Sequence, residues 1–182
     1  WVRLRPLRKE DLPRRLEMIN DPEVQRLTVG VVADPTAPED AEAWFFMLSQ
    51  DPYSEQFAVE TRDGVYIGDI DLHSIHVNPG EAWVSPMVGD RRFFAGPHRA
   101  EALSLVLDYA FGQKQLERVR IQIPETDVHG LRILEELGFR QVDEWLLDMM
   151  EGVRELTLEV DAQSFRPYRP VASPEADTGS RA

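Results

Sequence analysis

Apolar residues recur over the first fifty positions with the spacing of amphipathic helices. One helix is predicted over 11–20, because Asp11 is a favourable N-cap and Pro13 suits a first turn. Another turn or two of helix is expected over 23–27. A further helix begins near Thr36, and acidic residues in its first turn favour the positive end of the helix dipole.

Two more helices are predicted in the second half of the chain. Residues 100–111 are almost wholly apolar, so we expect a buried helix that Gly112 ends. Asp127 is the predicted N-cap of the other helix, whose leucines share one face, and Gly138 is a natural residue to end it.

Alternation of apolar and polar residues predicts the strands. Asp63-Gly64 and Asn78-Pro79-Gly80 are turn sequences between three consecutive strands, and Glu151-Gly152 is the expected turn of a last hairpin. The predicted strands are 2–6, 56–61, 65–73, 81–88, 118–124, 139–150 and 153–160.

The resulting order is β-α-α-β-β-β-α-β-α-β-β, which predicts a mixed α/β sheet with helices on its faces. A chain of 182 residues can bury a sizeable core, so we expect one domain over 1–162. From residue 163 onward the chain is rich in Pro, Ser and Ala, and a flexible tail over 163–182 is predicted.

Composition excludes several classes of protein. A formal net charge of −13 argues against a general nucleic-acid binder and mildly favours cationic substrates. With no cysteine there are no disulfides, thiolate metal sites or cysteine nucleophiles, and no apolar run reaches the ~20 residues of a membrane span. We therefore expect a cytoplasmic protein that does not span a membrane.

One basic loop stands out in this acidic chain. Arg91, Arg92, His98 and Arg99 lie directly before the apolar helix, where unpaired backbone N–H groups and the helix dipole favour an anion. A pyrophosphate group is one ligand that fits this pattern. An ordinary basic surface loop is the alternative.

Four stretches carry a resemblance to a known family. They are RLRPLRKEDLPRRLEMINDPEV near the start, IGDIDLH on the third predicted strand, AEAL in the central helix, and LRILEELGF near the end. With the order of elements over residues 2–160, they resemble the GNAT superfamily of N-acetyltransferases, and most of all its RimJ/RimL branch. That branch acetylates protein N-termini and small amines. The resemblance implies a mostly antiparallel central sheet with helices on both faces.

The resemblance further implies acetyl-CoA as co-substrate. The family's phosphate loop has an Arg/Gln-x-x-Gly-x-Gly/Ala signature, whereas this chain has FAGPHRAEA, with Pro97 and Arg99 at glycine positions. A partly exposed Arg99 is then expected to supply charge where backbone amides are lost. Backbone N–H groups at the end of the preceding strand, which includes Pro86, would hold the thioester oxygen. The implied cofactor-binding residues are Met87, Val88, Arg92, Phe94, Ala95, Gly96, His98, Arg99, Ala100 and Asp127.

Direct attack by an amine needs a base, because an amine of pKa near 10 is protonated at neutral pH. The candidates are Glu81, His73 and Asp71, with His76 as a further one in the adjoining turn. Asp71 and His73 share a face by alternation. His73 and His76 lack a third metal ligand at a familiar spacing, so no metal site is expected.

The proton donor that other GNAT branches provide is missing, because Leu134 stands where they have tyrosine. We expect acetyl transfer to an amine, such as a protein N-terminus, a small polyamine or an antibiotic. A non-catalytic GNAT-like module that binds CoA or a partner is the alternative, and a bulkier acyl group would also fit an altered loop. The sequence leaves open the identity of the acceptor and whether the protein forms a homodimer.

Overall fold

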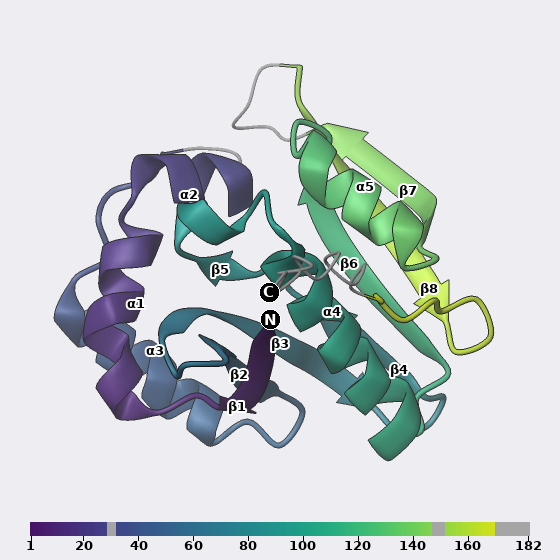
Figure 1. The fold of residues 1–182 in the computed structure, drawn as a ribbon, viewed down its shortest axis with the longest axis horizontal. Coiled ribbons are helices and arrows are strands. Elements are labelled where there is room, and N and C mark those ends of the chain that lie inside the picture. Colours follow the sequence, from purple (N-terminus) through teal and green to yellow (C-terminus); the bar gives the residue numbers. More distant parts are fainter. Residues whose placement is uncertain (29–31, 147–151, 170–182) are drawn as a thin grey trace, which may run out of the picture.

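The computed structural model describes residues 1–28, 32–146 and 152–169. Its centre is an eight-stranded sheet in the order β1-β2-β3-β4-β6-β8-β7, with β5 paired to β3 (Figure 1). Neighbouring strands are antiparallel except β4 and β6, which are parallel. The predicted mixed and mostly antiparallel sheet is therefore confirmed. The strands are β1 (Val2–Pro6), β2 (Glu55–Thr61), β3 (Tyr66–His76), β4 (Glu81–Val84), β5 (Val88–Gly89), β6 (Arg118–Pro124), β7 (Arg140–Leu146) and β8 (Arg154–Asp161).

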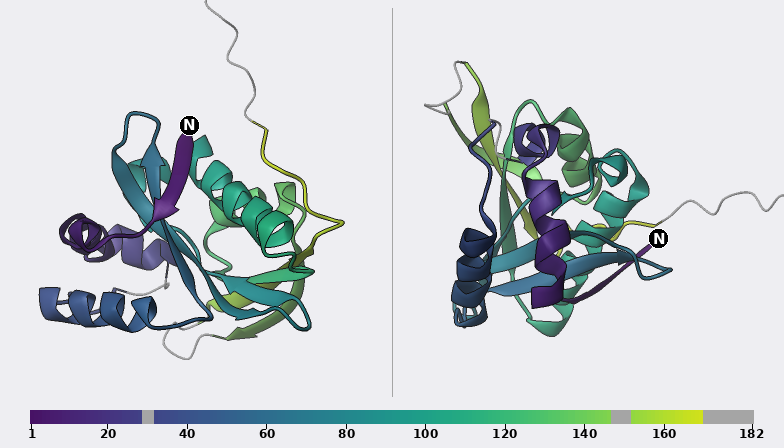
Figure 2. Two further views of the ribbon diagram at one scale, coloured as in Figure 1. Left: turned by 90° about the horizontal axis from the view of Figure 1, so that it is seen from below. Right: turned by 90° about the vertical axis from the view of Figure 1, so that its left-hand side faces the viewer.

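Helices cover both faces of the sheet. In Figure 2, left, α1 and α3 lie on one side of β1–β3 and α4 lies on the other. The helices are α1 (Leu12–Ile19), α2 (Pro22–Thr28), α3 (Pro38–Ser49), α4 (Pro97–Asp108) and α5 (Val128–Glu136), joined by the short helical turns η1 (Lys9–Asp11), η2 (Arg91–Phe93) and η3 (Tyr109–Gln113).

The core lies between the sheet and the helices α4 and α5, which cover one of its faces. Helix α4 is apolar on most sides because it packs into this core, where Val106 and Leu107 have no exposed surface. From α5, Leu134 reaches the same core and meets Ile121 and Ile123 of β6. The pattern of leucines on α5 therefore predicted the buried face of that helix.

Five details differ from the sequence-based expectations. The central helix begins at Pro97 and not at residue 100, so His98 and Arg99 lie in its first turn. Gly112 does not end the central helix, which continues as a π-helical turn through η3. The Asp11 carboxylate accepts no capping bond from α1; it accepts the Arg8 N–H and pairs with Arg5. His76 is the last residue of β3 and not part of a turn. Pro86 lies between β4 and β5, because the predicted single strand over 81–88 is interrupted there.

The first residues of the predicted tail lie against the core. Phe165 and Tyr168 pack on it, and the Tyr168 N–H donates to the Ser104 hydroxyl at 2.9 Å. The Arg166 N–H donates to the Leu137 carbonyl at 3.0 Å. The rest of the predicted tail, 170–182, and most of the last hairpin turn fall outside the described residues. No helix in the described ranges is long and apolar enough to cross a membrane.

Candidate functional site

Strands β4 and β6 separate after three paired residues, and this separation creates the site. They pair only from Glu81–Arg118 to Trp83–Arg120. Beyond that point β6 continues beside β8, while β5 pairs with Gly68 and Asp69 of β3. Residues 85–87 therefore line a gap in the sheet.

Apolar side chains fill most of this gap, which we call the throat. Its free volume is about 10 Å³, close to the smallest space that holds one water molecule. The charged or hydroxyl side chains that line it are those of Ser85 and Arg99. The Met87 N–H has no hydrogen-bond acceptor among the described residues, since β5 resumes its pairing at Val88. The throat is lined by Ile70, Ser85, Pro86, Met87, Arg99, Leu103, Ile121, Ile123, Gly130, Ile133 and Leu134.

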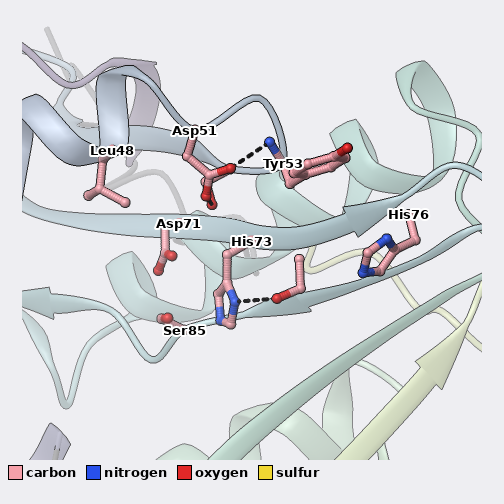
Figure 3. Close-up of a pocket in the computed structure, with 9 residues that line it drawn as sticks. Leu48, Asp51, Tyr53, Asp71, His73, His76 and Ser85 are labelled. Carbon is pink, nitrogen blue, oxygen red and sulfur yellow. Dashed lines mark hydrogen bonds between the residues drawn. The ribbon is translucent and has the colours of Figure 1, made fainter.

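On the face of the sheet next to α3, the throat adjoins an acidic cavity of about 520 Å³ (Figure 3). The structure brings Asp71 and His73 together there, and both line it. The Asp71 carboxylate makes no ion pair or hydrogen bond with any residue in the described ranges, and His73 Nδ1 lies 3.2 Å from the Ser74 hydroxyl. The acidic cavity is lined by Leu48, Asp51, Tyr53, Ser54, Asp71, His73, Ser74, His76 and Ser85.

Asp51 is the second carboxylate of the acidic cavity. Its oxygens accept the Ser54 hydroxyl at 2.6 Å and the Tyr53 N–H at 2.9 Å. These bonds favour the charged form, so the pKa of Asp51 lies below its ordinary value. Two carboxylates without a lysine or arginine partner among the described residues make this cavity suited to a cation.

At the other end of the throat lies the arginine pocket, with a volume of about 370 Å³. Each of its arginines already has a carboxylate partner. Arg91 pairs with Glu23, and Arg92 Nη2 lies 2.5 Å from Asp90 Oδ2. The hydrogen bonds to Glu23 and Asp90 raise the pKa values of the Arg91 and Arg92 guanidinium groups above their ordinary value. The arginine pocket is lined by Glu23, Leu27, Arg91, Arg92, Phe94, Ala95, Arg99, Asp127 and His129.

Arg99 forms the third pair, and it lies inside the protein. Arg99 as a whole residue is 7% exposed, and its Nη2 lies 2.5 Å from Oδ2 of Asp127, the N-cap of α5. Asp127 also accepts the Gly130 N–H at 2.9 Å. A Cβ on Gly130 would lie 2.4 Å from Asp127 Oδ2 and 2.7 Å from Arg99 Nη2, so the pair needs glycine there. The expectation of a partly exposed Arg99 is therefore wrong, because a carboxylate 28 residues away holds it.

Two of the predicted site residues, Glu81 and His98, lie outside the acidic cavity and the arginine pocket. Glu81 does not line the acidic cavity; it pairs with Arg118 at 2.9 Å and with Arg120 at 3.4 Å. His98 packs edge-on against Phe93, and its burial lowers its pKa.

Other members of the predicted set lie closer to the arginine pocket. Phe94 and Ala95 line that pocket, and the Ala95 carbonyl lies 2.9 Å from His129 Nε2. Gly96 and Ala100 line a neighbouring groove between α4 and α5. The prediction did not include Asp51 or Ser85. No local motif marks them, because their positions depend on the fold. Among the residues that the structure describes, no group of three His, Asp or Glu could hold a metal ion.

Three comparisons place this geometry among known proteins. A family model described as the acetyltransferase (GNAT) domain matches residues 2–140. No curated protein sequence matches the chain. A solved structure of spermidine N-acetyltransferase from Vibrio cholerae, in complex with CoA and spermine, aligns with a TM-score of 0.78 at 17% identity, over 90% of this chain and 96% of that one. A candidate acetyltransferase from T. thermophilus aligns with a TM-score of 0.71 at 24% identity, over 90% and 87%. At these identities the solved structures establish the fold alone.

Proposed function

We propose, since the chain belongs to the acetyltransferase (GNAT) domain family, that it transfers an acetyl group from acetyl-CoA to an amine that enters the acidic cavity. The transfer would occur at the junction of this cavity with the throat. A small cationic amine is the acceptor that we favour over a protein N-terminus. The Vibrio cholerae structure with CoA and spermine supports this choice.

The adjacency of the three spaces, which share lining residues, is the observation that carries the proposal. Ser85 lines both the acidic cavity and the throat, and Arg99 lines both the throat and the arginine pocket. A long thioester with phosphates at its far end fits this order of apolar throat and arginine-lined pocket. Because the throat is nearly filled, its side chains must move apart when the ligand enters. The free Met87 N–H is a suitable donor to the thioester oxygen.

The two carboxylates of the acidic cavity, which form no ion pair among the described residues, carry the choice of a cationic acceptor. Asp71 and Asp51 would attract a protonated amine, and Asp71 or His73 would then take the proton that the amine must lose before attack. Glu81 is less suited to this role, because two arginines hold its carboxylate.

Calorimetry with CoA and thiol-release assays with a panel of amines test the proposal. The wild type should bind CoA and release thiol with a small cationic amine. Asp71→Asn should lower kcat/KM for the amine by about 10–150-fold, the equivalent of losing a charge-assisted bond of about 1.5–3 kcal/mol. The matched control, Asp63→Asn in the β2–β3 turn, should leave kcat/KM unchanged. A wild type that binds no CoA would refute the proposal.

A non-catalytic CoA-binding module is the second candidate, and one observation favours it. Leu134, which is 2% exposed, lines the throat, and the resemblance to other GNAT branches implies a tyrosine proton donor at this position. CoA binding without thiol release across the amine panel would favour this module over the enzyme.

A further inference from the structure

Ser85 lies at the junction of the throat and the acidic cavity. It follows Val84, the last residue of β4, and its N–H donates to the Asp71 carbonyl at 3.2 Å. Since Leu72 pairs with Val84, Ser85 is the cross-strand neighbour of Asp71. Side chains of such neighbours share a face with Cβ atoms about 4.5–5.5 Å apart. Figure 3 shows the two side chains next to each other in the cavity.

The Ser85 hydroxyl is available to a ligand. The residue is half-buried, and no described residue forms a hydrogen bond with its hydroxyl. The other charged or hydroxyl group of the throat, the Arg99 guanidinium, is held by Asp127 at the opposite end. Leu134 offers no proton. Among the described residues that line the throat, Ser85 therefore supplies the hydroxyl donor, at the end where acetyl transfer would occur.

Resting on the proposed function, we propose that the Ser85 hydroxyl donates a proton to the sulfur that leaves during acetyl transfer. In this role Ser85 is a catalytic residue, and Asp71 beside it is the first proton acceptor. Together they would take the role of the tyrosine that the resemblance to other GNAT branches implies at position 134.

Each proton that moves in this reaction has a donor and an acceptor. The bound ammonium group gives one proton to Asp71, which passes it to water. The neutral nitrogen then attacks the carbonyl carbon, which forms the C–N bond, moves the C=O π pair onto oxygen and leaves the nitrogen positively charged. When the oxygen re-forms the C=O bond, the C–S bond breaks, its electron pair on sulfur takes the Ser85 proton, and the Ser85 oxygen regains a proton from the nitrogen. The products are a neutral amide and a free thiol, with one proton released to water.

The surroundings favour such a donor. A thiol such as that of cysteine has an ordinary pKa of about 8.5, and an apolar throat disfavours the thiolate further. A hydrogen bond from a hydroxyl to the thiolate favours the charged form and lowers the thiol pKa. The pKa of bound CoA therefore reports whether this contact exists, even without turnover.

The experiment compares the wild type with Ser85→Ala, which removes the hydroxyl, and Ser85→Thr, which retains it. Thiolate absorbance of bound CoA is titrated against pH, and kcat is measured with acetyl-CoA and the best amine of the panel. Ser49→Ala on α3 is the matched control, because the Ser49 hydroxyl is exposed and its partners among the described residues are the Phe46 carbonyl and the Gln50 amide.

We expect Ser85→Ala to raise the thiol pKa of bound CoA by about 1–2 units and to lower kcat on the order of 10²-fold. CoA affinity and thermal stability should stay close to those of the wild type. Ser85→Thr should restore much of kcat, and Ser49→Ala should change neither quantity.

An unchanged thiol pKa and kcat in Ser85→Ala would overturn the role of Ser85 and leave the proposed function intact. A loss of kcat without a change in thiol pKa would also overturn proton donation, because it would indicate a purely structural effect. A wild type that does not bind CoA would refute the proposed function and the role of Ser85 together.

Discussion

The acidic cavity and the arginine pocket lie at opposite ends of one throat, and they differ in whether their charged side chains form ion pairs within the protein. In the acidic cavity, Asp71 has no cationic partner in the described part of the chain. In the arginine pocket, Arg91, Arg92 and Arg99 each have a carboxylate partner. The first region is prepared for an external cation, whereas the second is already neutral before any anion arrives.

Unpaired and paired charges therefore have different roles in the two regions. Charges without partners attract a ligand, and the acidic cavity keeps such charges on an open surface. Charges with partners attract a ligand less, and removal of one member of a buried pair destabilises the protein because the other charge is left uncompensated. A phosphate that enters the arginine pocket must therefore share or displace Asp90, Glu23 or Asp127.

The largest effect is expected from Arg99→Ala. The Arg99 side chain is 9% exposed and that of Arg92 is 73% exposed. Removing Arg99 leaves the Asp127 charge buried without its partner, so the free energy of unfolding should fall by about 3–5 kcal/mol. Arg92→Ala should leave it close to the wild-type value. Urea unfolding measures both, and similar losses in the two variants would contradict the contrast between buried and exposed pairs.

A smaller effect is expected from salt. Raising ionic strength from about 0.01 M to about 1 M shortens the screening length from about 30 Å to about 3 Å. The KM of a cationic amine should rise several-fold, because Asp71 and Asp51 attract it over a distance. The Kd of CoA should change less, because its pocket is neutralised and screening also weakens repulsion by a chain of charge −13. Steeper salt dependence for CoA than for the amine would reverse the comparison.

The smallest effect concerns acid stability near the arginine pocket. The bond from Arg92 lowers the pKa of Asp90 below its ordinary value of 3.8. Since the folded-state pKa is depressed, the stability that Asp90 adds is complete above about pH 4 and is lost as the pH falls below it. Asp90→Asn should therefore lose less unfolding free energy than the wild type between about pH 5 and pH 2. Denaturation curves across this range measure the difference, and parallel losses would contradict it.

Local signals predicted much of the fold. Asp127 caps α5 through the Gly130 N–H, and Gly138 has the positive φ of 96° expected at the end of a helix. Such features depend on residues a few positions apart. The break between β4 and β5 and the π-helical turn after α4 were missed, because each depends on what the segment packs against.

The site was harder to predict for the same reason. Asp71 and His73 were placed together correctly, since alternation on one strand suffices to pair them. Ser85 was missed because its importance depends on where β6 separates from β4. Arg99 was expected to be partly exposed, because its sequence neighbours gave no sign of Asp127.

The close contact of Arg99, Asp127 and Gly130 restricts how this protein can vary. Replacing either Arg99 or Asp127 leaves the other charge buried without its partner. A methyl group added at Gly130 would lie 2.4 Å from Asp127 Oδ2. Each single change is therefore harmful, while a change at all three positions can restore a well-packed throat. Natural variation at this place should consequently proceed by linked substitutions, with the effect of Gly130→Ala depending on whether the ion pair is still present.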